Sequence, residues 1–340
     1  MAMDSETDID SPFPFRISPF VDGARAHMTN WVRQTGLVRR ASAGQRFERA
    51  DFGWFAAVVY PAATAPRLDL LADWFAWLFL VDDQLDDGEF GRDPDHLRTV
   101  IGQLRTVLES TDGQVDLGVR APTAVSALAD LWRRTAVRAT AEWRRRFVRH
   151  LELCLSTAAD WEAGNRQRAE IPSEDSYIAN RRHTGAIYPC MDLIEIAEGI
   201  SIRDDLHRSP EFTAALDAAC DVVCWTNDVY SLEKERSLGE VHNLVYLVQH
   251  HRGLDPRSAL DHVHRAIERQ TERFIEAEAR VLSTYPEFAA ELKMCLAGMR
   301  SWMRGNLDWS RQTKRYLPPS DTGAAAPEHY LETRLVEVER

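Results

Sequence analysis

Apolar residues recur along this chain with the spacing of an α-helix over most of its length. The clearest stretch begins at Ser258, and its apolar positions fall on one helical face. These positions are Leu260, Val263, Ile267, Phe274, Ala277 and Val281. A second stretch with this spacing predicts either two helices or one bent helix. Its apolar positions are Val125, Leu128, Trp132, Trp143, Phe147 and Leu151.

Turn-forming residues interrupt the helical pattern at intervals. The expected breaks fall near Gly88–Pro94, Ser110–Gly118, Gly164–Ser173, Ile200–Pro210, Gly253–Pro256 and Tyr285–Pro286. No stretch alternates apolar and polar residues as consecutive strands do, so a sheet is not expected. We therefore predict an all-α protein, a closed helical bundle whose sites are built from side chains on facing helices.

The two ends of the chain lack the helical pattern. We expect residues 1–11 to be disordered. The segment Pro12–Phe20 is rich in proline and phenylalanine and cannot be helical, so we expect it to cross the core as a strap. Residues 317–340 contain a Pro-Pro pair and a Gly-Ala-rich stretch, which predict a mobile tail whose last residues could form a short helix.

An acidic cluster directly follows the most apolar run of the chain. Asp82, Asp83 and Asp86 come after residues 74–81, which read Trp-Phe-Ala-Trp-Leu-Phe-Leu-Val. On a helix, residues three or four apart face the same way, so these carboxylates can converge. Mg²⁺, which binds carboxylates together with substrate phosphates, would relieve their repulsion. The alternative is a solvated acidic helix end, although carboxylates there oppose the helix dipole.

A second set of oxygen-bearing side chains lies far along the chain. Asn227, Ser231 and Glu235 are spaced four residues apart, which places them on one face of a helix. An amide oxygen, a hydroxyl and a carboxylate suit Mg²⁺ whose main role is to neutralise phosphate. The alternative is that Asn and Ser end the helix or bond back to its carbonyls.

Together the two motifs resemble those of the single-domain bacterial class I terpene synthases. Asp82-Asp83-x-x-Asp86 is similar to the family's aspartate-rich motif. The stretch that begins with Asn227-Asp228 and ends with Lys234-Glu235 is similar to its second metal motif. Further matches extend the resemblance from about Pro12 to Tyr316. They are Arg181 at the diphosphate-sensing position, Thr184 and Gly185 at the linker and helix-break positions, the pair Arg315-Tyr316, and Trp309 before that pair.

The resemblance implies a Mg²⁺-dependent lyase that ionises a linear isoprenyl diphosphate and cyclises the resulting cation. It implies an all-α class I bundle with a central apolar cavity, and a catalytic domain spanning residues 12–316. Three Mg²⁺ ions are expected, with direct contact by Asp83 or by Asp86 left open. Their ligands would be Asp82, Asp83, Asp86, Asn227, Ser231 and Glu235. The diphosphate would be bound by Arg181, Lys234, Arg315 and Tyr316.

Two positions in this scheme have rivals. Arg181 can bind phosphate oxygens through two nitrogens, but Arg182 lies only about 100° around the helix. Gly185 inside an apolar helix costs about 1 kcal/mol relative to Ala. With Pro189 four residues later, it predicts a kink that exposes backbone carbonyls. In the family such a break directs a carbonyl at the developing cation; the alternative is a kink made only for packing.

The cavity beneath the metals should be apolar and aromatic, because carbocations are attracted to aromatic faces. Phe55, Phe79, Trp225 and Trp309 are the candidates for its wall, and the alternative for each is an ordinary core position. Phe79 lies nearly one turn before Asp82, directly beneath the expected metal.

The length of the substrate chain is the main ambiguity. Single-domain bacterial cyclases mostly use farnesyl diphosphate, so we favour a sesquiterpene product. Leu78 and Cys190 are smaller than the aromatic residues common at these positions in the family. They keep geranylgeranyl diphosphate and a diterpene product open.

Composition narrows the class of protein further. The 340 residues are 44% apolar and 28% charged, with a net charge of −12 that speaks against nucleic acid or an anionic membrane as main partner. The five cysteines include no C-x-x-C pair and predict reduced thiols in a cytoplasmic protein. The acidic N-terminus does not resemble a signal peptide, and no apolar run is long enough to anchor the chain in a membrane.

Two other functions deserve comparison. A chain-elongating isoprenyl transferase shares the helical fold, but it uses two aspartate-rich motifs instead of an Asn/Ser/Glu set. A non-catalytic helical scaffold would not need competent residues at every matched position. A homodimer is an expectation from the family alone.

Overall fold

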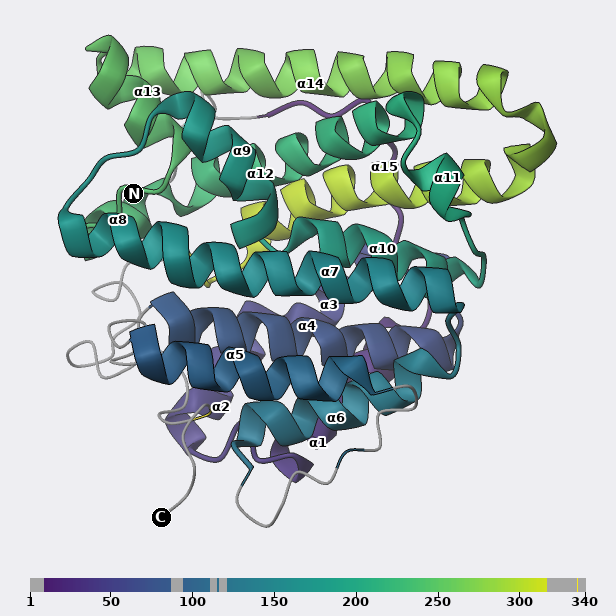
Figure 1. Cartoon of the computed structure of the whole chain (residues 1–340). Coiled ribbons are helices and arrows are strands. Elements are labelled where there is room, and N and C mark those ends of the chain that lie inside the picture. Colours follow the sequence, from purple (N-terminus) through teal and green to yellow (C-terminus); the bar gives the residue numbers. More distant parts are fainter. Residues whose placement is uncertain (1–8, 87–93, 111–114, 116–120, 317–334, 336–340) are drawn as a thin grey trace.

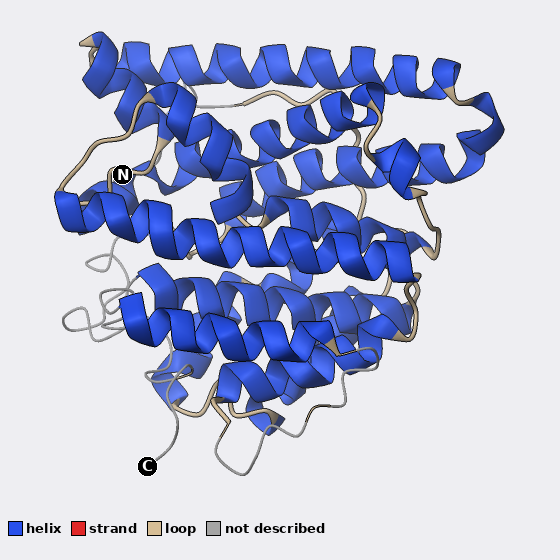
Figure 2. Ribbon diagram, in the orientation of Figure 1, coloured by secondary structure: helices blue, strands red, loops and turns tan. Residues whose placement is uncertain are grey.

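The computed structural model describes residues 9–86, 94–110, 115, 121–316 and 335, without the side chains of residues 85, 86 and 94–97. None of these residues forms a strand (Figure 2). The elements are α1 (Val21–Gln34), α2 (Ala41–Ala50), α3 (Phe52–Val59), α4 (Ala65–Asp86), α5 (Pro94–Glu109), α6 (Thr123–Ala136), α7 (Ala141–Thr157), the π-helix η3 (Ala158–Glu162), α8 (Ala163–Arg168), α9 (Glu174–Thr184), α10 (Ile187–Glu198), α11 (Asp204–His207), α12 (Pro210–Leu238), α13 (Leu244–Arg252), α14 (Pro256–Thr284), the 3₁₀ turn η4 (Pro286–Phe288) and α15 (Ala289–Gln312).

The long helices lie side by side in layers (Figure 1). Helix α14 forms one side of the bundle and packs along α12, which in turn contacts α15. Helices α7 and α10 lie in the middle, and α4 packs on α1 and α6 toward the opposite side. This all-α bundle is the fold that the sequence predicted. None of the described helices combines the length and apolarity needed to cross a bilayer.

Local signals fix the ends of α12, the helix that carries the second motif. The side chain of Ser209 accepts a hydrogen bond from the backbone N–H of Phe212, and Pro210 occupies the first turn. Both residues are typical of helix starts. The helix ends at Gly239, whose φ of 74° suits glycine.

Buried tryptophans fill the core between α4, α6 and α7. Trp74 and Trp143 are almost fully buried, and Phe147 packs edge-to-face on Trp74 at 5.1 Å between ring centroids. Each indole N–H has a partner, because Trp74 donates to Thr135 Oγ1 (2.9 Å) and Trp143 donates to the carbonyl of Asp192 (2.9 Å). The hydrogen bonds let these large side chains be buried without an unsatisfied donor.

The N-terminal strap is present. Phe13 is buried and meets Phe274 edge-to-face at 5.9 Å, and its carbonyl accepts a hydrogen bond from Arg304. Ile9, within the segment expected to be disordered, is buried as well. Residues 1–8 and all of the expected mobile tail except Leu335 lie outside the described residues; Leu335 itself is buried, and its carbonyl accepts from Ala124 N (2.9 Å).

The middle of the chain differs from the expected pattern in two ways. The stretch from Val125 to Leu151 forms two helices, α6 and α7, so the bent-helix alternative is wrong. The break expected to begin at Gly164 begins only after Arg168, because η3 joins α7 to α8 without interruption. A π-helical turn takes an extra residue and often occurs at functional sites.

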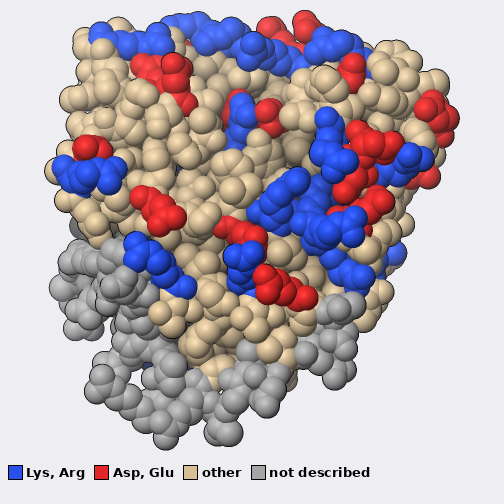
Figure 3. Space-filling model, viewed as in Figure 1, with Lys and Arg blue, Asp and Glu red and all other residues tan. Residues whose placement is uncertain are grey.

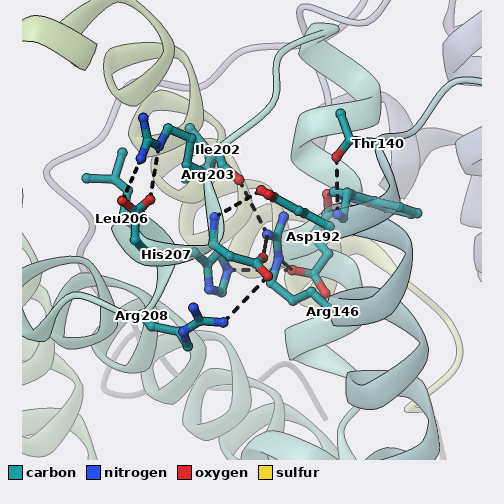
Figure 4. Close-up of polar contacts among 12 residues, drawn as sticks. Thr140, Arg146, Asp192, Ile202, Arg203, Leu206, His207 and Arg208 are labelled. Atoms are coloured by element: carbon teal, nitrogen blue, oxygen red, sulfur yellow. Dashed lines mark hydrogen bonds and ion pairs between the residues drawn. The ribbon is translucent and has the colours of Figure 1, made fainter.

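A buried ionic network joins α7 to α10 and α11 (Figure 4). Arg146 forms ion pairs with Asp192 (3.0 Å), Glu195 and Asp204 (3.2 Å). His150 Nδ1 lies 2.7 Å from Asp192 Oδ2. Burial by itself would raise the pKa of Asp192, but His150 and Arg146 hold that pKa well below its usual range.

One surface groove is rich in arginine despite the net negative charge. It has a volume of about 390 Å³ and lies between α5, α6 and α7. Figure 3 shows basic side chains gathered on this face with acidic ones among them. The arginines lining the groove are Arg105, Arg144, Arg145 and Arg149.

Candidate active site

A cavity of about 700 Å³ opens between the ends of α4, α9, α12 and α15. Asp82 and Asp83 reach it from the last turns of α4, whereas Asn227, Ser231 and Glu235 reach it from α12. The two motifs therefore face one space, although they lie far apart in the sequence. The volume is typical of a small-molecule site, for which about 300–1,000 Å³ is usual.

The first two aspartates differ in their surroundings. The side chain of Asp82 is 47% exposed, and that of Asp83 is 3% exposed. Arg315 binds both carboxylate oxygens of Asp83, at 2.8 and 3.1 Å. Asp82 is therefore the carboxylate that stands at the cavity mouth, at 3.9 Å from Arg315. Asp86 lies in the last turn of α4, and its side chain is outside the described part of the chain.

Asn227 is held from both ends of its amide. Its Oδ1 accepts from Arg181 Nη2 (2.7 Å), and its Nδ2 donates to the hydroxyl of Tyr316 (2.5 Å). Ser231 Oγ donates to the carbonyl of Asn227 (2.8 Å), as the alternative interpretation of this residue expected. That bond uses the hydroxyl hydrogen and leaves the oxygen lone pairs for another ligand.

Glu235 completes the oxygen-bearing face of α12. Its Oε2 accepts from Asn243 Nδ2 at 2.8 Å. Burial, together with the nearby charge of Asp228, raises the pKa of Glu235 to about 7. A buried carboxylate in this setting is stabilised by a divalent cation, so the donor set fits a metal ion that prefers oxygen ligands.

Asp228, which sequence reasoning did not single out, fixes Arg181. The carboxylate is completely buried and accepts from Arg181 Nε (3.1 Å), from Tyr177 OH (2.7 Å) and from the N–H of Leu244 (3.1 Å). It thereby ties α12 to α9 and α13. No local sequence pattern pointed to this role of Asp228, because the groups that it binds lie far from it in the sequence.

Arg181 and its neighbour Arg182 face different surroundings. Arg181 lines the cavity, as predicted for a diphosphate-sensing residue. Arg182 instead binds both oxygens of Asp221 (2.6 and 2.8 Å) and also Asp217 (2.6 Å). The geometry therefore favours Arg181 over its rival.

The C-terminal pair Arg315-Tyr316 also lines the cavity, together with Lys234. The guanidinium of Arg315 lies over the ring of Phe79, 5.0 Å from its centroid. Tyr316 meets Trp309 edge-to-face at 5.6 Å. Two of the four predicted diphosphate-binding residues are thus in direct contact with the predicted aromatic wall.

The kink expected at Gly185 is a complete break between α9 and α10. Gly185 has ordinary helical φ, and the left-handed residue is Ala186, with φ 55° and ψ 24°. Gly185 serves instead to leave space, since a Cβ there would lie 3.1 Å from Arg181 Nη1. Thr184, Gly185 and Ala186 all line the cavity.

The aromatic wall is largely as predicted. Phe55 stacks on Trp309 with ring centroids 4.3 Å apart, and Phe79 lies 5.8 Å from Trp309. The prediction for Trp225 is wrong, because this residue is buried but does not line the cavity. Two residues before Asn227, it lies about 200° around α12 and faces away. Sequence reasoning missed Phe75, Trp77, Trp302 and Asn306, which do line it.

Comparison with known proteins assigns the chain to a family. The family model described as terpene synthase family 2, C-terminal metal binding, matches residues 73–273, which contain both motifs. The chain belongs to the terpene synthase family. It is therefore an enzyme of the lyase class, as the sequence motifs predicted, and its family carries a divalent-metal-binding region.

Several relatives match this terpene synthase over most of their length. The (+)-T-muurolol synthase of Roseiflexus castenholzii is 34% identical over 318 residues, 94% of this chain and 96% of the relative. The pristinol synthase of Streptomyces pristinaespiralis is 33% identical over 325 residues, 93% and 85% of the two chains. Among solved structures, a linalool/nerolidol synthase from Streptomyces clavuligerus has a TM-score of 0.80 at 26% identity and covers 89% of this chain and 100% of its own.

Proposed function

We propose that this terpene synthase ionises farnesyl diphosphate and cyclises the cation to a sesquiterpene. The observation that carries the proposal is the cavity itself, in which two oxygen-rich motifs face each other above an aromatic wall. The (+)-T-muurolol synthase that resembles this chain is named for cyclising (2E,6E)-farnesyl diphosphate. A diterpene cyclase acting on geranylgeranyl diphosphate is the alternative.

The metal ions would be Mg²⁺, three in number, held at the two motifs. When bound, they supply Lewis-acid stabilisation of the negative charge on the leaving diphosphate. The ligands would be Asp82, Asp83, Asp86, Asn227, Ser231 and Glu235. Their oxygen atoms are the type that Mg²⁺ prefers.

Four side chains would bind the diphosphate as its bond to the allylic carbon breaks. Arg181 and Arg315 present planar guanidinium groups that can bind two phosphate oxygens at once. Lys234 adds a point charge and Tyr316 a hydroxyl donor, and all four line the cavity. Because these donors already line the cavity, only the contacts of Arg181 with Asn227 and of Arg315 with Asp83 have to be exchanged for phosphate oxygens.

The wall would then protect and fold the cation. Phe55, Phe79 and Trp309 present π faces, which attract positive charge and offer no nucleophile. Exclusion of bulk water from this part of the cavity prevents premature capture of the cation. After Thr184 the chain leaves helical geometry at Gly185 and Ala186, so backbone carbonyls near the cavity can face the cation.

The test is turnover of geranyl, farnesyl and geranylgeranyl diphosphate with Mg²⁺, read by release of diphosphate and by mass spectrometry of an organic extract. We expect farnesyl diphosphate to give cyclic sesquiterpenes without isopentenyl diphosphate. Asn227→Leu and Glu235→Leu should abolish turnover and keep the helical circular dichroism signal, because each removes an oxygen ligand.

Glu233→Leu is the matched control, since the Glu233 side chain is 78% exposed on the same helix and lies outside the cavity lining. It should remain active. Full activity of the Asn227 and Glu235 variants would show that the second metal site is assigned wrongly. A product obtained only from geranylgeranyl diphosphate would favour the diterpene alternative. Cytoplasmic location and a homodimer stay predictions.

A further inference from the structure

Asn306 is a polar side chain within the aromatic part of the cavity wall. It lies on α15 between Trp302 and Trp309, and all three residues line the cavity. Their spacings of four and three residues place them on one face of the helix. Asn306 is only 3% exposed, so its amide is shielded from bulk solvent.

Only one end of this amide has a partner within the described part of the chain. Nδ2 donates to the carbonyl of Val223 at 3.1 Å, whereas no described residue donates to Oδ1. Among the described residues, Oδ1 is not one of the fully buried atoms that lack a partner, so it can be reached from the cavity and can accept a hydrogen bond there. In polar cavities an ordered water commonly supplies the missing hydrogen bond.

The contact with Val223 also fixes the depth of the amide. Val223 precedes Asn227 by four residues, which is slightly more than one turn, or about 6 Å, along α12. Asn306 therefore lies about one turn deeper in the cavity than the metal motif. This is the level at which the hydrocarbon part of a substrate would begin.

A second polar residue, Thr184, lines the cavity from the end of α9. The hydroxyl of Thr184 is buried and has no hydrogen-bond partner among the described residues. The adjacent Gly185 lies close to α12 at Cys224, the residue after Val223. A Cβ added at Gly185 would lie 3.4 Å from the Cys224 sulfur. Asn306 and the Thr184–Gly185 segment thus approach the same turn of α12 from α15 and from the end of α9. A water held by Asn306 would need Thr184 as its second partner.

We propose that Asn306 holds a water molecule that captures the final carbocation, so that the product is a sesquiterpene alcohol. The inference rests on the proposed function and specifies its product class. A lone pair of the water oxygen forms the new bond to the cationic carbon. The resulting oxonium passes one proton to the diphosphate that has already left, so water is the only added reagent.

The fixed amide explains how a single water can be used without admitting others. The bond from Nδ2 to Val223 holds the plane of the amide, and Oδ1 then accepts one hydrogen of the water. The water keeps a lone pair directed away from the amide. Neither neighbouring indole offers further waters a hydrogen bond, because Trp309 Nε1 donates to the carbonyl of Ala50 and Trp302 Nε1 is buried.

The test uses the full-length enzyme with farnesyl diphosphate and Mg²⁺ in water enriched in the heavy oxygen isotope. The wild type should yield an alcohol that carries the solvent oxygen. Asn306→Leu is close in volume but cannot accept a hydrogen bond, and Asn306→Ala removes the amide altogether. Each should lower the ratio of alcohol to hydrocarbon by about tenfold or more while diphosphate is still released.

Ser301→Ala is the matched control on the same helix. Ser301 is buried, its hydroxyl donates to the carbonyl of Ala297, and it does not line the cavity. This variant should keep the wild-type product ratio. A wild type that makes only hydrocarbons overturns the inference and leaves the proposed cyclase function intact. An unchanged alcohol share in both Asn306 variants also overturns it, whereas absence of any diphosphate release counts against the proposed function instead.

Discussion

At the scale of single residues, Asp228 shows how one buried carboxylate positions a larger site. It binds Arg181, accepts from Tyr177, and caps the backbone at Leu244. Arg181 in turn holds Asn227. Asp228 itself does not line the cavity, so it acts through these contacts.

Asp228→Asn removes the charge that opposes the buried guanidinium of Arg181. We expect kcat to fall on the order of a hundredfold, because a small displacement of a binding group is costly in catalysis. Diphosphate-release kinetics measure the effect. Tyr177→Phe is the control, since it removes the hydrogen bonds of the phenol to Asp228 and to the carbonyl of His242, each worth about 1 kcal/mol, and leaves the charge in place. Equal kinetics for the two variants would contradict a positioning role for Asp228.

Residue spacing predicted which motif side chains would meet, but not the partners that hold them. Asn227, Ser231 and Glu235 share a helical face, and this follows from their spacing alone. The contact of Arg315 with Asp83 joins residues 232 positions apart, and no local pattern encodes it. Trp225 was misassigned because its aromatic character was weighed without its angle around α12.

At the scale of elements, the break between α9 and α10 shapes one wall of the site. Gly185 is required for space, whereas Ala186 adopts the left-handed conformation that L residues disfavour. Replacing glycine by alanine at position 185 and alanine by glycine at position 186 should therefore have opposite effects.

Gly185→Ala should reduce turnover, because its Cβ would lie 3.1 Å from Arg181 Nη1 and the guanidinium would have to move. Ala186→Gly should stabilise the fold by about 1 kcal/mol, since glycine adopts this conformation without strain. Urea unfolding and diphosphate-release assays distinguish these effects. If the Gly185→Ala variant kept wild-type kinetics, Gly185 would not be needed to leave space for Arg181.

The spacing of apolar residues predicted most of the helices, but it did not predict where neighbouring helices begin and end. Periodicity located the apolar faces of α6 and α7, but their division depended on turn residues that allowed either outcome. The π-helical turn η3 had no sequence signal, because its residues also suit an α-helix. Two of its residues, Ala158 and Glu162, line the cavity.

At the scale of the whole molecule, Arg146 joins three elements through buried charge. Its side chain is 2% exposed and pairs with Asp192, Glu195 and Asp204. These contacts hold α10, whose first turn reaches the cavity at Ile187 and Cys190. The network therefore supports the site from outside it.

Arg146→Met should destabilise the protein by about 3–5 kcal/mol, because it leaves the buried Glu195 without its cation and Asp192 with only its histidine partners. The midpoint of urea unfolding reports the change. Arg203→Met is the control, since Arg203 and its partner Asp205 are both more than half exposed. The control should leave the midpoint unchanged. A midpoint shift of equal size in both variants would show that burial of the network does not matter.

The overall composition gives the net charge of the molecule but not where charged side chains gather on its surface. The net charge of −12 did not foretell the arginine-lined groove between α5 and α7. The cavity volume was likewise beyond prediction, because it depends on how large side chains such as Trp302 pack. The sequence predicted an apolar hollow under the metal motifs, but its dimensions come from the assembled bundle.

An arginine contacts each metal motif: Arg181 donates a hydrogen bond to Asn227, and Arg315 donates one to Asp83. A cation bound at Asn227 Oδ1 would weaken the hydrogen bond from Arg181 Nη2, because two positive groups repel at such short range. That nitrogen is then available to donate to a phosphate oxygen, whereas Nε keeps its hydrogen bond to Asp228. Metal and diphosphate should consequently bind with positive cooperativity, each strengthening the other by the same factor. We therefore expect little turnover until both the metal ions and the diphosphate substrate are bound.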